Sequence, residues 1–259
     1  RKASIPVVEA SAGLEYELTR RIRTLAVPGK RAIGFVDGHG EITPTTPGVA
    51  PLFGRVSEWL DPQPVRLESP LPPLDALWVV APKASFKKSE REALSRWLDS
   101  GKTLGLMLSR RAVDFKQFRA WPLETGLEPL LAEWGVSLGE GFVVDAHAER
   151  IQLDTPVGGF VASRVQDYPF LPMATRLNPS HPVMRGLRAV GFPFVHPVRR
   201  TEGSDVEFET LAESSPQSWH EIGFDLSPSR SLSALSSGQP GPYALAAARA
   251  LLRHTKLTA

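Results

Sequence analysis

The sequence of 259 residues contains no cysteine. Disulfide bonds, thiolate metal sites and a cysteine nucleophile are therefore excluded, although this absence identifies no cellular compartment. A run of about 18 apolar residues is also missing, so the sequence predicts no membrane-spanning helix. The first residues, RKASIPVVEASAG, lack the long apolar stretch of a signal peptide. If the protein is secreted or anchored, we expect the responsible segment to lie outside these residues.

A strong net charge is absent as well. Lys and Arg number 30 and Asp and Glu number 28, which gives a formal net charge of +2. The arginine doublets at 20–21, 110–111 and 199–200 are scattered along the chain, whereas a nucleic-acid surface needs a concentrated basic stripe. The composition therefore argues against nucleic acid as a partner. The apolar share of 42% is ordinary for a globular protein, and the length allows a full hydrophobic core.

The stretch RAIGFVDGHGE, residues 31–41, is the most informative part of the sequence. A short apolar run (Ala32, Ile33, Phe35 and Val36) stops abruptly at the polar and glycine-rich DGHGE. This pattern predicts a buried parallel strand that delivers polar side chains at its carboxyl end. In an open α/β sheet, ligands usually bind at that end.

Strands and helices are expected to alternate through the first part of the chain. The apolar spacing predicts helices at 14–25, 52–60, 89–100 and 127–134, and strands at 31–36, 65–67, 74–81, 102–109 and 142–144. Alternation of this kind is typical of βαβ units. It predicts an α/β fold with a doubly wound, mostly parallel sheet.

The alternation ends after Asp145. Strands are expected within 151–165, 190–198 and 206–211, and a turn with a short helical segment within 178–187. The closing GPYALAAARALLRHT favours a helix by residue propensity. We predict that residues 1–150 form the parallel α/β core and that residues 151–259, rich in strands, complete the same domain.

Nine stretches together resemble, in matching order, the auxiliary domain of gliding-motility-type ABC transporter systems. They begin with the helix at 14–25 and IGFVDGHGE, and the others are LDALWVVAPK, RWLDSGKTLGLML, LLAEWGVSLGEGFVVD, NPSHPVMRGL, AVGFPFVHPV, LAESSPQSW and GPYALAAA. Each stretch alone is weak, but in register they span nearly the whole chain. One departure is the ending, LLRHTKLTA, where the family continues into another strand and a Gly-Asp-x-Asp-Phe-like turn.

The resemblance implies a sheet of the flavodoxin or class I glutamine-amidotransferase type with additional C-terminal strands. It also implies kinship with a domain of an intraflagellar transport subunit, and it makes GPYALAAA a strand against its propensity. In the family, the domain lies outside the cytoplasm (in the periplasm), tethered by transmembrane helices. Its expected partners are therefore the ABC permease and ATPase subunits.

The polar residues after the first strand are the principal candidates for ligand binding: Asp37, Gly38, His39, Gly40 and Glu41. On this hypothesis, the glycines let the backbone approach a ligand at the edge of the sheet. The alternative is a tight turn, in which the glycines supply positive φ angles and the side chains bind neighbouring loops.

A second polar group follows the strand at 142–144. Asp145, His147 and Glu149 alternate, so an extended backbone would point them to one side, where they would suit a divalent metal together with His39. The alternative is an exposed polar loop. We expect Asp145 and His147 to contribute to ligand binding, without a metal or other cofactor.

Ser109 ends a predicted strand at the place of the nucleophile in an amidotransferase-like fold, but the G-x-S-x-G elbow is missing. We therefore expect Ser109 to cap a loop and the protein not to be an enzyme.

Trp121 and Trp219, in predicted loops, are candidates for stacking on a glycan. The leading hypothesis is a non-catalytic extracytoplasmic domain that binds a protein partner or a ligand such as a glycan. The alternative is an amidotransferase-like or metal-dependent hydrolase.

Overall fold

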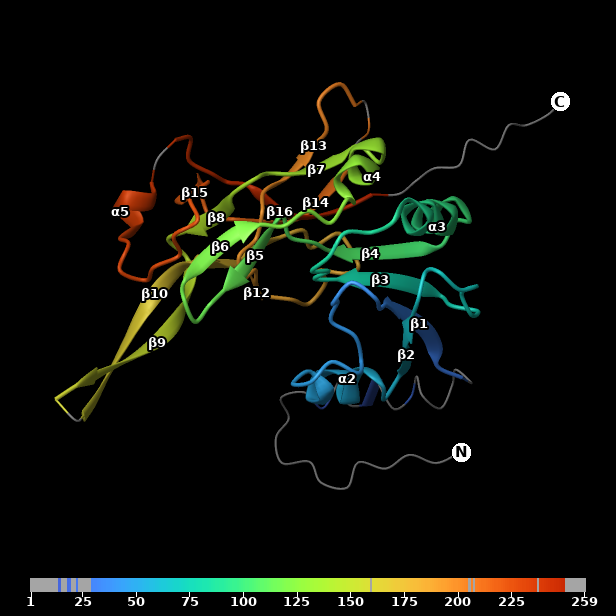
Figure 1. The fold of residues 1–259 in the computed structure, drawn as a ribbon, viewed down its shortest axis with the longest axis horizontal. Coiled ribbons are helices and arrows are strands. Elements are labelled where there is room, and N and C mark those ends of the chain that lie inside the picture. Colours follow the sequence, from blue (N-terminus) through green and yellow to red (C-terminus); the bar gives the residue numbers. More distant parts are fainter. Residues whose placement is uncertain are drawn as a thin grey trace. The chain divides into compact units, whose positions relative to one another are not determined.

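The computed structural model describes residues 29–249, except 159, 205, 207 and 237, together with the isolated positions 14, 18, 19 and 22. Contacts between residues divide the chain into two units (Figure 1). Unit 1 contains residues 1–80 and 102–107, and unit 2 contains residues 81–101 and 108–259. The four isolated positions are helical, but most of the helix expected at 14–25 lies outside the described residues.

Unit 1 is built on a four-stranded parallel sheet with the order β2-β1-β3-β4. The strands are β1 (Arg31–Val36), β2 (Leu60–Val65), β3 (Ala76–Val80) and β4 (Thr103–Met107), and the helix α2 (Ala50–Val56) joins β1 to β2. The strand expected at 65–67 lies earlier in the chain. Pro62 and Pro64 are tolerated in β2 because it is an edge strand, where the missing N–H groups need no partner.

The order of these strands places β1 at a switch point. From β1 the chain passes to β2 on one side, and the next strand, β3, pairs with the other side of β1. In open parallel sheets, ligands bind outside the carboxyl ends of the strands at such a switch point. The DGHGE segment begins at this edge of the sheet, and the Ile42 N–H after it donates to the Val80 carbonyl at the end of β3, at 2.9 Å.

Unit 2 contains three helices and twelve strands among the described residues. The helices are α3 (Lys88–Asp99), α4 (Glu128–Glu133) and α5 (Leu232–Leu235). The strands form five small sheets, each of two or three strands, and every pairing is antiparallel. The pairs and triplets are β5-β6 (Arg111–Asp114, Arg119–Pro122), β13-β7 (Val198–Arg200, Val136–Leu138), β15-β8 (Ser218–Glu221, Phe142–Asp145), β12-β10-β9 (Val190–Gly191, Phe160–Ala174, Ala148–Val157) and β11-β14-β16 (Arg176–Leu177, Glu209–Glu213, Ala244–Ala248).

Helix α3 matches its predicted position within two residues. Its N-cap is Lys87, and the Glu90 carboxylate accepts a hydrogen bond from the Lys87 backbone N–H at 2.7 Å. Gly101 follows the helix with a φ of 80°, the left-handed conformation that ends many helices. No helix among the described residues combines the length and apolar character needed to cross a membrane.

Strand β8 is buried on both of its faces. The side chains of Phe142 and Val144 belong to one hydrophobic cluster, with Tyr168 and Phe170. Val143, which points the opposite way, belongs to a second cluster with Leu211, Ala212 and Leu245. All four residues of β8 have no exposed surface, so this strand forms the centre of unit 2.

Strands β9 and β10 form a long two-stranded ribbon that extends from the rest of unit 2 (Figure 1). The expectation of strands within 151–165 is therefore confirmed. Strand β16 confirms the strand implied at GPYALAAA by family resemblance. Pairing with β14 outweighs the helix propensity of its alanines.

The expected α/β class is confirmed, but the doubly wound, mostly parallel arrangement is not. The fold is mixed α/β, with a small parallel sheet and several antiparallel sheets. The strand expected at 142–144 exists as β8, but it pairs antiparallel with β15 and does not extend the parallel sheet. Residues 178–187 form successive turns without the expected helix.

Trp219 lies in β15 and packs against the cluster of Tyr168, whereas Trp121 is exposed on β6.

Candidate functional site

The DGHGE turn is closed by its own side chains. Gly38 and Gly40 have φ angles of 142° and 76°, so both positions use the conformational freedom of glycine. The Glu41 carboxylate accepts hydrogen bonds from the His39 backbone N–H at 2.6 Å and from His39 Nδ1 at 3.0 Å. Both residues are buried, with exposed fractions of 9% and 5% for His39 and Glu41.

Asp37 differs from its neighbours in the turn. Its backbone N–H donates to the Val65 carbonyl at 2.8 Å and so continues the pairing of β1 with β2. Its side chain is half-buried and has no hydrogen-bond or ion-pair partner among the described residues. Asp37 is thus the carboxylate of this turn that remains available to a ligand at the switch point.

Asp145, at the end of β8, is buried and fully hydrogen-bonded. Its carboxylate accepts from the His147 backbone N–H at 2.8 Å, from the Ser215 backbone N–H at 2.7 Å and from the Ser215 hydroxyl. His147 and Glu149 are exposed. No group of three or more His, Asp or Glu side chains suited to a metal occurs in the described part of the chain. The carboxylate of Asp145 therefore fixes the turn before β15.

Ser109 has a histidine partner that the sequence could not indicate. Ser109 Oγ lies 2.8 Å from His196 Nε2, and it also contacts the Arg111 carbonyl at 2.7 Å. His196 Nδ1 lies 2.7 Å from the Gly141 carbonyl oxygen, which only accepts, so Nδ1 carries the proton and Nε2 is the acceptor. The Arg110 backbone N–H also donates to Nε2, at 3.1 Å.

This serine–histidine pair lacks the third group of a catalytic triad. In a triad, a carboxylate at Nδ1 stabilises the imidazolium that forms when the serine loses its proton. Here a neutral carbonyl occupies that place. Burial, together with the charges of Arg111 and Arg110, lowers the pKa of His196 to about 4, against the hydrogen bond to Gly141, which raises it. The imidazole is therefore a poor proton acceptor at neutral pH, and the pair is suited to holding the loop at Ser109.

The lowered pKa of His196 predicts a pH dependence of folding. His196 takes up a proton near pH 6.5 in the unfolded state and near pH 4 in the folded state. Its contribution to stability is therefore fully present above pH 6.5 and is lost as the pH falls towards 4. Between pH 8 and pH 5, we expect this residue to remove about 2 kcal/mol from the free energy of unfolding. Urea titrations of wild type and His196→Gln across this range would measure it. An equally steep loss in the variant would assign the dependence to other groups.

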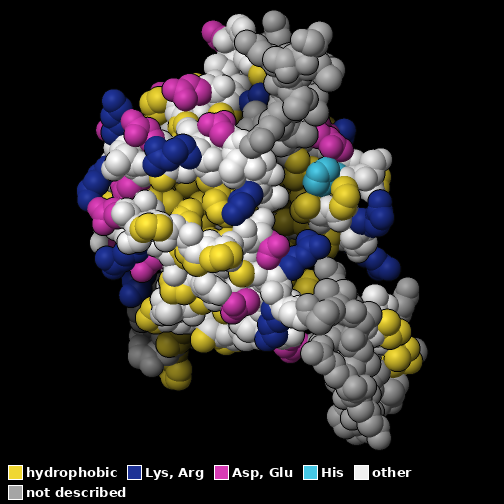
Figure 2. Space-filling view, turned by 90° about the vertical axis from the view of Figure 1, so that its right-hand side faces the viewer, with side chains coloured by type: hydrophobic (Ala, Val, Ile, Leu, Met, Phe, Trp, Pro, Cys, Tyr) yellow, Lys and Arg dark blue, Asp and Glu magenta, His cyan; other side chains and the backbone are white. Residues whose placement is uncertain are grey.

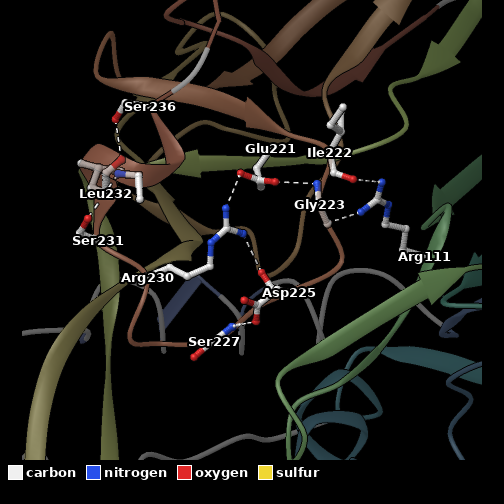
Figure 3. A network of polar contacts seen from close by, with 11 residues as sticks. Arg111, Glu221, Ile222, Gly223, Asp225, Ser227, Arg230, Ser231, Leu232 and Ser236 are labelled. Atoms are coloured by element: carbon white, nitrogen blue, oxygen red, sulfur yellow. Dashed lines mark hydrogen bonds and ion pairs between the residues drawn. The ribbon is translucent and has the colours of Figure 1, made fainter.

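Arg111 lies at one end of a second polar network (Figure 3). Its guanidinium donates to the Gly223 carbonyl and, at 2.7 Å, to the Ile222 carbonyl. It also stacks on the rings of Phe142 and Phe224, at 5.4 and 4.2 Å from their centroids. Burial lowers the pKa of Arg111. This side chain ties β5 to the loop that follows β15.

The same network orders the rest of that loop. The Glu221 carboxylate accepts from the Gly223 N–H at 2.6 Å and forms an ion pair of 3.1 Å with Arg230. Arg230 also donates to the Asp225 carbonyl at 2.9 Å, as Figure 3 shows. The loop at 222–230 is thus held by side chains at both of its ends.

A pocket of about 350 Å³ lies beside strands β7 and β13 in unit 2. Its lining includes Arg110, Ser137, Gly139, Glu140, Arg199 and His220. None of these residues was a sequence candidate, because they come from four separate segments. On the face drawn in Figure 2, basic and acidic side chains are interspersed.

Comparisons with known proteins confirm the ABC-transport part of the family resemblance. The model of the family described as "ABC-type uncharacterized transport system" matches residues 30–251. A solved structure titled "mmIFT52 N-terminal domain" aligns with a TM-score of 0.50 and 17% identity, covering 74% of this chain and 82% of that chain. At this identity, the likeness concerns the fold. No curated protein matches the sequence.

Proposed function

The chain belongs to the ABC-type uncharacterized transport system family, and from this premise we propose that it is a non-catalytic auxiliary domain that binds a partner or ligand for a transporter. The proposed partners are the permease and ATPase subunits of an ABC transporter of the gliding-motility or export type. The proposed location is outside the cytoplasm, next to the membrane. The family match over residues 30–251 carries this proposal.

The proposed binding region is the switch point of the parallel sheet. Asp37 contributes a carboxylate without a partner among the described residues, while His39 and Glu41 fix the turn around it. The strand order β2-β1-β3-β4 supports a relationship with amidotransferase-like sheets, in which ligands bind at this edge. A glycan is one ligand that carboxylates of this kind recognise through its hydroxyl groups.

Copurification tests the proposal. The full-length protein, tagged and extracted from its native membrane with mild detergent, should recover the permease and ATPase subunits. A tagged, unrelated membrane protein from the same host would serve as the control. Recovery of the chain without either transporter subunit would refute the proposed partnership.

We expect the His39→Ala variant to remain folded and to recover the transporter subunits less efficiently, by about tenfold, because the turn that positions Asp37 loses its hydrogen bond to Glu41. Quantitative immunoblots of the copurified subunits and thermal unfolding would be measured together. Lower stability with unchanged recovery would mean that the turn has a structural role. Asp37→Asn is the companion variant, since this side chain is half-buried and its loss should leave stability unchanged.

A serine hydrolase is the second candidate, favoured by the 2.8 Å contact between Ser109 Oγ and His196 Nε2. The neutral carbonyl at Nδ1 and the lowered pKa of His196 oppose it. Labelling with a fluorophosphonate probe distinguishes the two functions. We expect no labelling of wild type. Labelling that Ser109→Ala abolishes would establish the hydrolase.

A further inference from the structure

The pocket beside β7 and β13 is lined mainly by hydrogen-bond donors. Arg199 and Ser137 are directly opposite each other in the antiparallel pair of these strands, so their side chains share one face. Both line the pocket. Arg199 is exposed, and its guanidinium has no hydrogen-bond or ion-pair partner among the described residues. A positive charge with five N–H donors is therefore available at one side of the pocket.

Arg110 supplies a second guanidinium, already held in place. Its Nη1 donates to the Leu138 carbonyl at 3.1 Å, which orients the side chain and leaves most of its donors unused. Its Nη2 lies 3.9 Å from a carboxylate oxygen of Glu140. Because the Glu140 side chain is 78% exposed, solvent weakens this ion pair, and Glu140 partly offsets the positive charge of the pocket.

His220 adds a neutral donor. Its Nε2 accepts from the Gly141 backbone N–H at 3.1 Å, so in the neutral ring Nδ1 carries the proton. Burial lowers the pKa of His220, and the charges of Arg199 and Arg111 lower it further, so these arginines act at this position. The Nδ1–H has no partner in the described part of the chain.

The wall of the pocket is rigid because the backbone is closely packed. A Cβ atom at Gly139 would lie 2.5 Å from Pro197 Cγ and 3.4 Å from His220 Nε2. The segment at 139–141 therefore contacts the residues behind it at distances that glycine alone permits. Donors held by such a wall lose little freedom when a ligand binds.

We propose that this pocket binds a small anion, with a carboxylate or phosphate group held by Arg199 and Arg110 and a further hydrogen bond from His220. Planar guanidinium groups recognise both oxyanions by paired hydrogen bonds. The site lies in unit 2 and is separate from the switch point of unit 1. The proposal of an anion site remains valid if the proposed transporter partnership fails, because the binding of a small molecule is measured on the isolated chain.

Titrations followed by ¹H–¹⁵N NMR would test the site, with inorganic phosphate and glucuronate as the two anion probes and glucose as the uncharged control. We expect shifts at the Gly139 and His220 amides with the anions and none with glucose. Arg199→Ala should weaken binding by about tenfold or more, because a charge-assisted contact is lost. Glu140→Gln should strengthen it.

Arg200→Ala is the matched control. Arg200 is the next residue of β13, exposed like Arg199, but it points to the opposite face and does not line the pocket. We expect its affinity to equal that of wild type. An equal loss in Arg199→Ala and Arg200→Ala would overturn the proposal, since it would show general charge attraction. The absence of any anion-dependent shift in wild type would overturn it as well. Phosphate alone or glucuronate alone producing shifts would identify which oxyanion binds.

Discussion

We expect the Arg111→Met substitution to lower the free energy of unfolding by about 4 kcal/mol, because it removes two charge-assisted hydrogen bonds from a buried guanidinium. Arg111 has an exposed fraction of 7%, and its guanidinium donates to Ile222 and Gly223. Methionine keeps much of the volume and the apolar stem. The loss therefore measures the hydrogen bonds and the contacts with the rings of Phe142 and Phe224.

Urea unfolding followed by tryptophan fluorescence would measure this effect. Arg200→Met is the control, since Arg200 is exposed and should change the free energy of unfolding by less than about 0.5 kcal/mol. An Arg111→Met variant as stable as this control would contradict the stabilising role of Arg111 in the network of Figure 3.

The second large effect is expected at Gly141. A Cβ atom there would lie 2.2 Å from the Glu221 carbonyl oxygen and 2.7 Å from its carbon, both of which are backbone atoms. Backbone in a paired strand cannot move aside as a flexible side chain can. We expect Gly141→Ala to destabilise the protein by about 3 kcal/mol or more, because β8 and β15 must separate at this end.

The same displacement would break two hydrogen bonds, since the Gly141 N–H donates to His220 and its carbonyl accepts from His196. Thermal unfolding by calorimetry gives the stability, and Gly191→Ala gives the comparison. At Gly191 the nearest atoms to an added Cβ are 3.8 Å away, so the change should stay within about 0.5 kcal/mol. Similar melting temperatures for the two variants would argue against the close contact at Gly141.

Much of unit 1 could be predicted from local pattern. The apolar run before DGHGE and the apolar stretch at 74–81 each indicate a strand of unit 1 without distant contacts, and in unit 2 the apolar face of α3 indicates a helix in the same way. The position of strand β2 was predicted too late in the chain, because its two prolines argue against a strand unless it lies at the edge of a sheet. Strand β16 was recovered through family resemblance, since alanine alone favours a helix.

The polar pairs of unit 2 depend on contacts far apart in the chain. Ser109 and His196 are separated by 87 residues, and Arg111 and Gly223 by 112. A single sequence carries no signal for such pairs, because strand pairing brings them together only after folding. By contrast, Asp37, His39 and Glu41 could be named as candidates from the sequence, because they alternate directly after a predicted strand.

The two-sided burial of β8 has a consequence for the cooperativity of unfolding. Small antiparallel sheets are marginally stable on their own, and the described residues of unit 2 form five of them. Because Phe142 and Val144 enter one hydrophobic cluster and Val143 the other, opening β8 removes side chains from both at once. These sheets should therefore unfold as one block, and the slowest-exchanging amides of the two clusters should share a single opening free energy.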